Sequence, residues 1–226
     1  MALTKVRGKG VDGGTISTET AGTNNLILGS TAGDSIASGG NYNTVIGDTA
    51  GTALTTGDEN TAVGFEALAT EDAHGENTAI GYRALKALNA GGNGYNVAVG
   101  ARCGIVMTTG TKNTGVGSYS LNTLTEGFDN TAVGQGALNA DTKGNKSVAI
   151  GVDSLTNQNF TSSTDGHNVA VGHSAGTALT TGTENTLIGA RTGVAMTDCD
   201  RNVAVGYLSL STNTKSDRNV AIGRSA

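Results

Sequence analysis

A five-residue word, Asn-x-x-x-Gly, recurs along nearly all of this 226-residue chain and constrains its fold more than any other feature. The word begins twelve times between Asn25 and Asn219, with Ser147 once in place of the asparagine, and eight of the eleven spacings are 17 residues. Self-similarity at a fixed short period is the signature of repeat architectures, in which each unit packs against its neighbours. We therefore divide the chain into an N-terminal segment, residues 1–24, and a repeat array, residues 25–226.

Each repeat unit predicts one coil of a β-structure. With the asparagine as position zero, position one is mostly Thr or Val, position two mostly Ala, and position three Val, Ile or Leu. Three residues are too few for a helix, and the β-branched side chains favour a short strand. The glycine at position four suits a bend with positive φ. Twelve coils stacked in register form an all-β, parallel β-solenoid or β-roll, with layers about 4.8 Å apart and a length of roughly 55–60 Å.

The asparagines are expected to form a ladder along one corner of the array. An amide side chain carries both a donor and an acceptor, so that each asparagine can bond to the layers on either side. Ser147 would keep part of this pattern. The predicted ladder consists of Asn43, Asn60, Asn77, Asn96, Asn113, Asn130, Asn168, Asn185, Asn202 and Asn219.

Positions eight and eleven vary together, which indicates a packed interior. Position eight is Gly in five units, and position eleven is then apolar, as at Gly104 and Met107. Position eight is Leu in six units, and in four of these position eleven is polar, as at Leu138 and Asp141. We interpret the pattern as compensation of volume, because an empty site in a packed core leaves a cavity.

The strand predicts burial on both of its faces. Positions one and three are apolar or Thr, whereas positions two and four are Ala and Gly, so neither face is polar. We expect positions one and three to fill the interior and the Ala/Gly face to pack against other copies of the chain. Three interwound chains would close such a homotrimeric fibre with cyclic symmetry.

Composition excludes several classes of protein. Fourteen basic and nineteen acidic residues give a net charge of −5, which argues against a nucleic-acid partner. No apolar run approaches the roughly 20 residues of a membrane span, and the first residues lack the apolar core of a signal peptide. The two cysteines are too few for a disulfide framework. We expect Cys103 to be a buried free thiol and Cys199, in a turn, to be exposed.

No catalytic or metal-binding constellation emerges from the sequence. The only histidines are His74, His167 and His173, and neither HxH nor CxxC occurs. The stretch Gly91–Asn96 only partly resembles a calcium-binding β-roll word, because it lacks the regular Asp. We therefore expect no enzymatic activity, no cofactor and no metal.

Binding candidates are the aromatic residues of position five and the two units that exceed the period. Aromatic side chains can stack on the sugar rings of a surface glycan, and insertions in solenoids often carry binding. The longer units have 19 residues, with the addition around 89–95, and 21 residues, with the addition around 157–165. A neutral bulge and ordinary exposed aromatics are the alternative interpretation. The receptor-binding candidates are Phe65, Tyr82, Tyr207, Tyr95, Asn159 and Phe160.

The words Asn60–Leu68, Asn77–Leu85 and Asn130–Leu138 resemble the NTAVGYQAL repeats of bacteriophage tail-fibre proteins. Lys146–Gly151 is similar to the SVAIG repeats in the β-roll heads of trimeric autotransporter adhesins. The resemblance implies a trimeric fibre of the virion, assembled in the host cytoplasm, that binds a host-surface glycan or protein. The opening Ala2–Val6 resembles the start of tail-fibre chains, which implies attachment to other tail or baseplate proteins through the N-terminal segment. The intramolecular chaperone and tip domain of that family are not recognisable.

Three other functions share parts of this pattern. A secreted surface adhesin would have the same fold but needs an export signal. An ice-binding β-solenoid needs a flat array of exposed Thr, and the Val residues that interrupt position one argue that this position faces inward. A polysaccharide-degrading spike needs paired carboxylates in a groove, whereas Asp and Glu here are scattered through turns.

Overall fold

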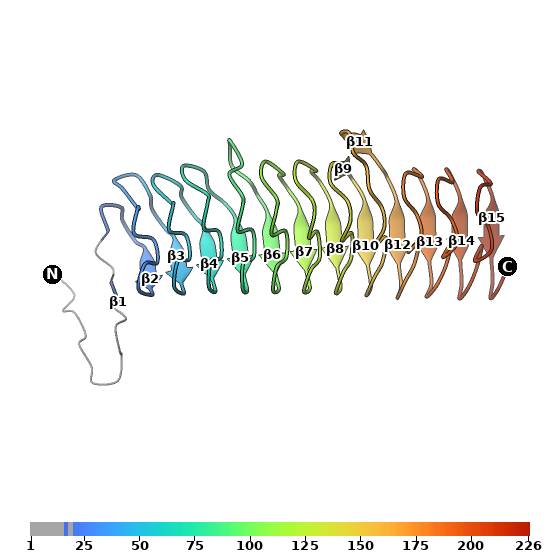
Figure 1. The fold of residues 1–226 in the computed structure, drawn as a ribbon, viewed down its shortest axis with the longest axis horizontal. Coiled ribbons are helices and arrows are strands. Elements are labelled where there is room, and N and C mark those ends of the chain that lie inside the picture. The colour runs from blue at the N-terminus through green and yellow to red at the C-terminus, as the bar shows by residue number, and fades with distance from the viewer. Residues whose placement is uncertain (1–15, 18–19) are drawn as a thin grey trace.

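The computed structural model describes residues 16–17 and 20–226, and the fold is a rod of coils stacked along one axis (Figure 1). The predicted all-β parallel β-solenoid with about twelve coils is confirmed. The described residues form no helix, so none of them belongs to a helix long and apolar enough to cross a membrane. The strands of the stack are β2 (Leu26–Leu28), β3 (Thr44–Ile46), β4 (Thr61–Val63), β5 (Thr78–Ile80), β6 (Val97–Val99), β7 (Thr114–Val116), β8 (Thr131–Val133), β10 (Val148–Ile150), β12 (Val169–Val171), β13 (Thr186–Ile188), β14 (Val203–Val205) and β15 (Val220–Ile222).

Equivalent residues of successive words pair with one another in a single parallel sheet. Thr61 pairs with Thr78, and Val148 pairs with Val169 across the longest unit, so the extra residues do not shift the register. At the N-terminal edge, β1 (Ile16–Ser17) pairs with β2 in the antiparallel sense. A second, two-stranded parallel sheet joins β9 (Gly144–Asn145) to β11 (Thr164–Asp165) beside the longest unit.

The asparagine side chains connect the coils, and all of them are buried except Asn219 at the C-terminal end. The backbone N–H of Asn113 donates to Asn96 Oδ1 at 3.0 Å, and its Nδ2 donates to the same oxygen at 3.3 Å. Nδ2 of Asn113 also donates to the carbonyl of Gly127, 14 residues further along the same coil, at 2.7 Å. An asparagine bonded in this way links its coil to the preceding coil and braces the two arms of its own. Asn77, Asn202 and Asn219 keep the link to the preceding coil but donate to a carbonyl two or three residues away.

The ladder changes partners at Ser147. The Ser147 N–H still donates to Asn130 Oδ1, but the amide of Asn168 turns to Gln158 Oε1, at 2.9 Å. Gln158 Nε2 in turn donates to Asp141 Oδ2 at 2.7 Å. The carboxylate of Asp141 thus ends the C-terminal stack of amides as a pure acceptor.

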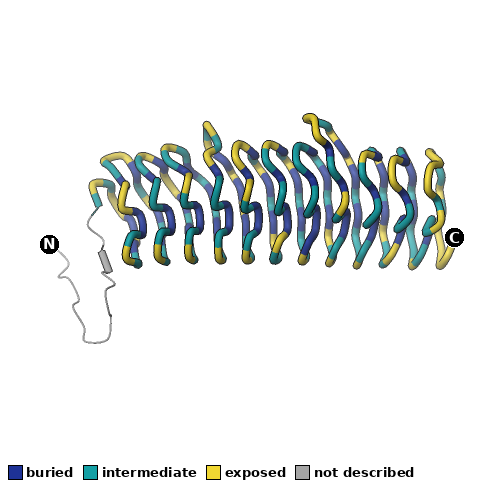
Figure 2. The backbone as a smooth tube through the Cα atoms, in the orientation of Figure 1, coloured by how far each residue is buried: buried dark blue, intermediate teal, exposed yellow. Residues whose placement is uncertain are grey.

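The interior of the coil lies on the side of position two, opposite to the expectation. Ala62, Ala132 and Ala204 are fully buried within the single chain, whereas positions one and three are half-buried or exposed. Alternate residues of a strand point to opposite faces, so Thr, Val and Ile of positions one and three point outward. The coil is so narrow that only a small side chain fits at position two wherever position eight carries Leu. The Ala face therefore does not pack against sister chains. Figure 2 shows the buried residues following the strands and the adjoining arms of the coils.

Volume compensation operates inside each coil and includes position two. A Cβ built on Gly51 would lie 2.8 Å from Leu54 Cδ1 and 3.2 Å from Val45 Cγ1. A Cβ on Gly193 would meet Met196 and Leu187 in the same way. Bulky side chains at position two therefore occur in coils with Gly at position eight. Position eight has φ between 46° and 61° in all eleven units that contain it, including those with Leu, so burial of the Leu side chain offsets a strained backbone.

Position four requires glycine for two reasons: its φ is positive, and the backbone of the next coil lies too close for a Cβ. Gly64 has a φ of 130°, and a Cβ on it would lie 2.6 Å from the carbonyl oxygen of Gly81 in the next coil. An L side chain would therefore push adjacent layers apart.

Gly104→Leu and Leu138→Gly should each lower the melting temperature. A Cβ on Gly104 would lie 2.9 Å from Leu85 Cδ2 and 3.4 Å from Met107 Cε, so a larger side chain overpacks the coil, at a cost of about 1–3 kcal/mol. Leu138→Gly opens a cavity, partly offset by relief of its φ of 49°. Thermal unfolding followed by circular dichroism measures both effects. Adding Met107→Ala to Gly104→Leu should recover part of the loss, and unchanged melting of both single variants would contradict the packing.

Asp141→Asn should destabilise the rod by about 1–3 kcal/mol, although it preserves shape, because an NH2 group would then face Gln158 Nε2. Rotating the amide would instead lose the N–H groups of Gly144 and Phe160, which both donate to Oδ1. Asp129→Asn is the matched control at an exposed site and should change the free energy of unfolding little. Equal denaturant midpoints for the two variants would count against this role of Asp141.

Candidate functional site

The first candidate feature is an uncharged outer face of the parallel sheet, which we call the strand face. It consists of the first and third residues of the twelve parallel strands β2–β8, β10 and β12–β15. The first residues form row one, with six Thr, five Val and one Leu, and the third residues form row three, which is Val, Ile or Leu throughout. Exposed members include Val97, Val116 and Ile150, at 36–39% exposure. A continuous surface in which three quarters of the side chains are Val, Ile or Leu is typical of an interaction site.

A second feature, the aromatic ridge, follows the bend after the glycine of position four. It consists of Phe65, Tyr82, Arg83, Arg102 and Tyr119. The rings of Phe65 and Tyr82 stack with centroids 5.8 Å apart. Arg83 lies 4.9 Å from the Tyr82 centroid, and Arg102 lies between Tyr82 and Tyr119, donating to the Tyr119 hydroxyl at 3.2 Å.

Packing of side chains on one another limits which parts of the predicted aromatic candidates a ligand can reach. Phe65, Tyr82 and Tyr207 are 40–43% exposed, but other side chains of the rod cover ring faces. Phe65 of the preceding coil and Arg83 of the same coil lie against Tyr82, and Arg224 of the next coil lies 5.8 Å from the Tyr207 centroid. Ring edges and hydroxyls therefore remain accessible, while stacking partners are supplied from within the chain.

The two longer units protrude from the rod beside β5 and at β11 (Figure 1). Tyr95, in the first of them, is 49% exposed. In the second, Asn159 is half-buried and its Oδ1 accepts a hydrogen bond from Thr142 at 2.9 Å. Phe160 is buried against Gly144 and Gly166, whose missing side chains leave space for its ring. Phe160 is therefore part of the core and was wrongly included among the exposed candidates.

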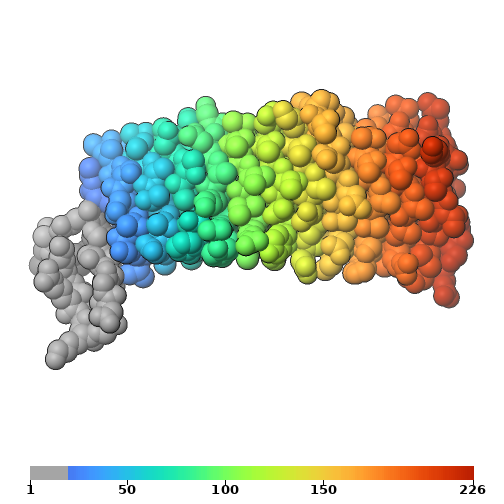
Figure 3. Space-filling model, in the orientation of Figure 1, coloured from blue at the N-terminus to red at the C-terminus, as the bar shows by residue number. Residues whose placement is uncertain are grey.

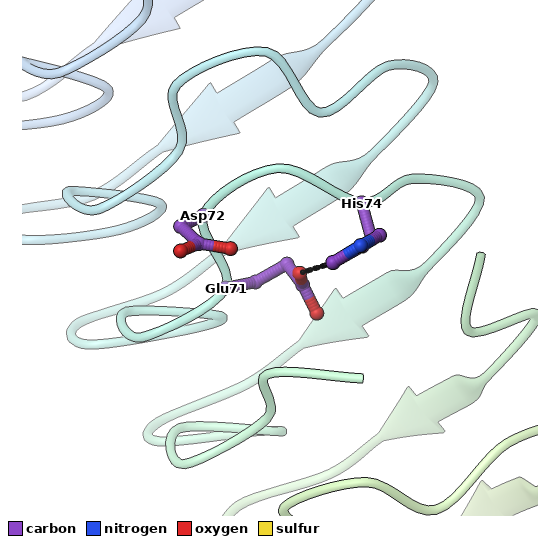
Figure 4. A group of neighbouring side chains, drawn as sticks. All are labelled: Glu71, Asp72 and His74. Carbon is purple, nitrogen blue, oxygen red and sulfur yellow. Dashed lines mark hydrogen bonds and ion pairs between the residues drawn. The ribbon is translucent and has the colours of Figure 1, made fainter. Parts of the chain in front are cut away.

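Glu71, Asp72 and His74 bring three potential ligand atoms within 4.8 Å of one another (Figure 4). Glu71 occupies position eleven and is fully buried, and burial raises the pKa of its carboxyl group. Its Oε1 lies 3.3 Å from His74 Nδ1, and its Oε2 accepts the N–H of Ala90 at 3.2 Å. These internal bonds explain how the coil holds a buried carboxylate. The sequence analysis missed this contact, although polar residues at position eleven signalled it.

Carboxylates also gather at a hollow lined by Asp58, Glu59 and Glu76. Asp58 Oδ1 accepts the N–H of Asn41 at 2.6 Å, and Glu76 Oε1 accepts Asn93 Nδ2 at 2.6 Å. Both contacts connect adjacent coils, so these acidic groups serve the stacking of layers.

Both cysteines are buried, which corrects the expectation that Cys199 is exposed. Burial raises the pKa of the Cys103 thiol to about 11, and its Sγ lies 3.1 Å from Ser120 Oγ. Burial also raises the pKa of Cys199.

The chain matches no family model, no curated protein and no solved structure.

Native protein should leave both thiols unlabelled by a thiol-specific reagent at pH 8, whereas denatured protein should expose two. The reason is that a buried protonated thiol is a poor nucleophile. The folded Cys103 thiol keeps its proton to a higher pH than the unfolded thiol, so the free energy of unfolding should fall as pH rises from about 8.5 towards 11. Rapid labelling of folded protein would contradict the burial of these side chains.

Proposed function

We propose that this chain is a shaft component of a bacteriophage tail fibre, a rigid homotrimeric rod that attaches the virion to a host surface. The observation that carries the proposal is the strand face, an uncharged surface that runs along twelve in-register coils. A rod that exposes such a face along its whole length suits assembly into a fibre. The resemblance of its words to tail-fibre repeats supports the same role.

Host contact is assigned to the parts that depart from the regular coil. The protruding loop that carries Tyr95 and the edges of the aromatic ridge are accessible in the single chain. Their hydroxyl and guanidinium groups suit hydrogen bonding to a surface glycan or protein. The N-terminal segment, which carries the predicted attachment to other tail or baseplate proteins, lies outside the described residues except for β1 and the residues from Thr20 onward. We propose no catalytic role, cofactor or nucleic-acid partner.

Ice binding is the second candidate, because the structure reverses the argument made against it. Position one faces outward, so its six half-buried Thr side chains belong to an outward-facing row that also carries Val and Leu. The composition of the face still favours protein contact, since the other eighteen positions carry Val, Ile or Leu.

Antibodies raised against the purified chain test the tail-fibre role. Immunogold electron microscopy should label the fibres of phage particles from infected cells that express the chain, and the antibodies should reduce adsorption to the host. Labelling of the envelope of uninfected cells would support the adhesin alternative instead. Thermal hysteresis of the purified protein, without labelling of particles, would support ice binding.

A further inference from the structure

We propose that the strand face is the surface through which copies of this chain associate side by side. The inference rests on the proposed fibre of several chains and names the contact surface. It replaces the Ala face, which the structure places inside the single coil. In an assembly whose rotation axis runs along the rod, row one of one copy lies against row three of the next.

The strand face is large enough for a stable interface. Its twenty-four side chains are half-buried or exposed in the single chain, and Ile80 and Ile188 remain 38% and 40% exposed although coils cover both sides of their own. Together they offer on the order of 1,000 Å² per chain, compared with the roughly 800 Å² that each partner buries in a standard stable interface, and three copies would divide this area between two contacts per chain. Association would remove this apolar area from water, which is the main driving force for such contacts.

The face carries no charge, which limits the energetic cost of burying it. None of its positions is Asp, Glu, Lys, Arg or His, so association desolvates no ion there. Charged side chains lie one residue before the asparagine in many coils, as at Glu59, Lys112 and Arg201. An apolar centre with charged residues nearby in each coil matches the usual anatomy of protein interfaces.

The periodicity of the face favours a second copy over an unrelated partner. Side chains along each row repeat at the spacing of a β-sheet, about 4.8 Å, over twelve layers. A surface with the same period can interdigitate with this one along its whole length, and another copy of the chain has that period. An irregular surface would leave gaps, and each gap loses van der Waals contacts.

The test is a matched pair of substitutions in one coil. Ile150, in row three, and Val152, two residues further along and outside the face, are each 39% exposed. Ile150→Lys places a charge on the face, whereas Val152→Lys adds the same charge to the same coil elsewhere. Both side chains point outward, so circular dichroism and thermal melting should show that both variants fold as the unmodified protein does.

Multi-angle light scattering after size-exclusion chromatography measures the mass of the particle. The unmodified protein and Val152→Lys should both have the mass of an assembly of two or more chains, each of 22.4 kDa. Ile150→Lys should lower the mass at the same concentration, and Ile80→Lys, Ile150→Lys and Ile188→Lys together should give 22.4 kDa. Adding Val148→Glu, in row one, to Ile150→Lys should restore part of the assembly.

The remaining outcomes overturn the inference in distinguishable ways. A mass of 22.4 kDa for the unmodified protein would contradict both the proposed multichain fibre and the role of the strand face as its contact surface. A multimer that Ile150→Lys leaves intact would keep the fibre and reject this face. Thermal hysteresis of a monomer that Ile150→Lys abolishes would assign the face to ice.

Discussion

Stacking at the hydrogen-bonding distance of a β-sheet is the constraint on which the structure depends. Each side chain meets its own counterpart one coil away, so the sequence can use only residues that tolerate their own repetition. Asparagine satisfies this rule because it both donates and accepts, and the glycine of position four because it has no Cβ. Some charged residues satisfy it by pairing with the opposite charge one coil away, as Glu66 does with Arg83 and Glu184 with Arg201. The outcome is a rod of nearly uniform outline (Figure 3).

The sequence was sufficient to predict the coil, the register and the residues that repeat. The period fixes which residues stack, and the choice of Asn and Gly follows from elementary hydrogen bonding and sterics. It was not sufficient to decide which face of the strand points inward. Both faces are apolar or small, so hydrophobicity does not distinguish them, and the width of the coil decides. A usable signal existed: Val45 and Leu187 at position two coincide with Gly51 and Gly193 at position eight, which places both positions in one interior.

The candidate site was predicted less well than the fold, because local exceptions do not follow the period. Phe160 lies in an insertion and was expected to face solvent, yet the two glycines beside it make room for its ring in the core. Glu71, Asp141 and Gln158 occupy position eleven and are buried, each with hydrogen-bond partners. Among the described residues, no buried side-chain nitrogen or oxygen lacks a partner. Such pairings depend on single contacts across coils, which neither composition nor periodicity specifies.

The direction of the amide ladder gives the rod an electrical polarity. From Asn77 to Asn130 and again from Gln158 to Asn219, each side-chain amide of the stack donates to a side-chain oxygen on its N-terminal side. These amide dipoles align as peptide dipoles do in a helix. The stack that begins at Gln158 therefore presents its positive end to Asp141. A carboxylate at that point compensates the dipole in the way that an anion does at the first turn of a helix. Asp141 thus divides the rod into two electrostatic segments, although the backbone sheet runs through both without interruption.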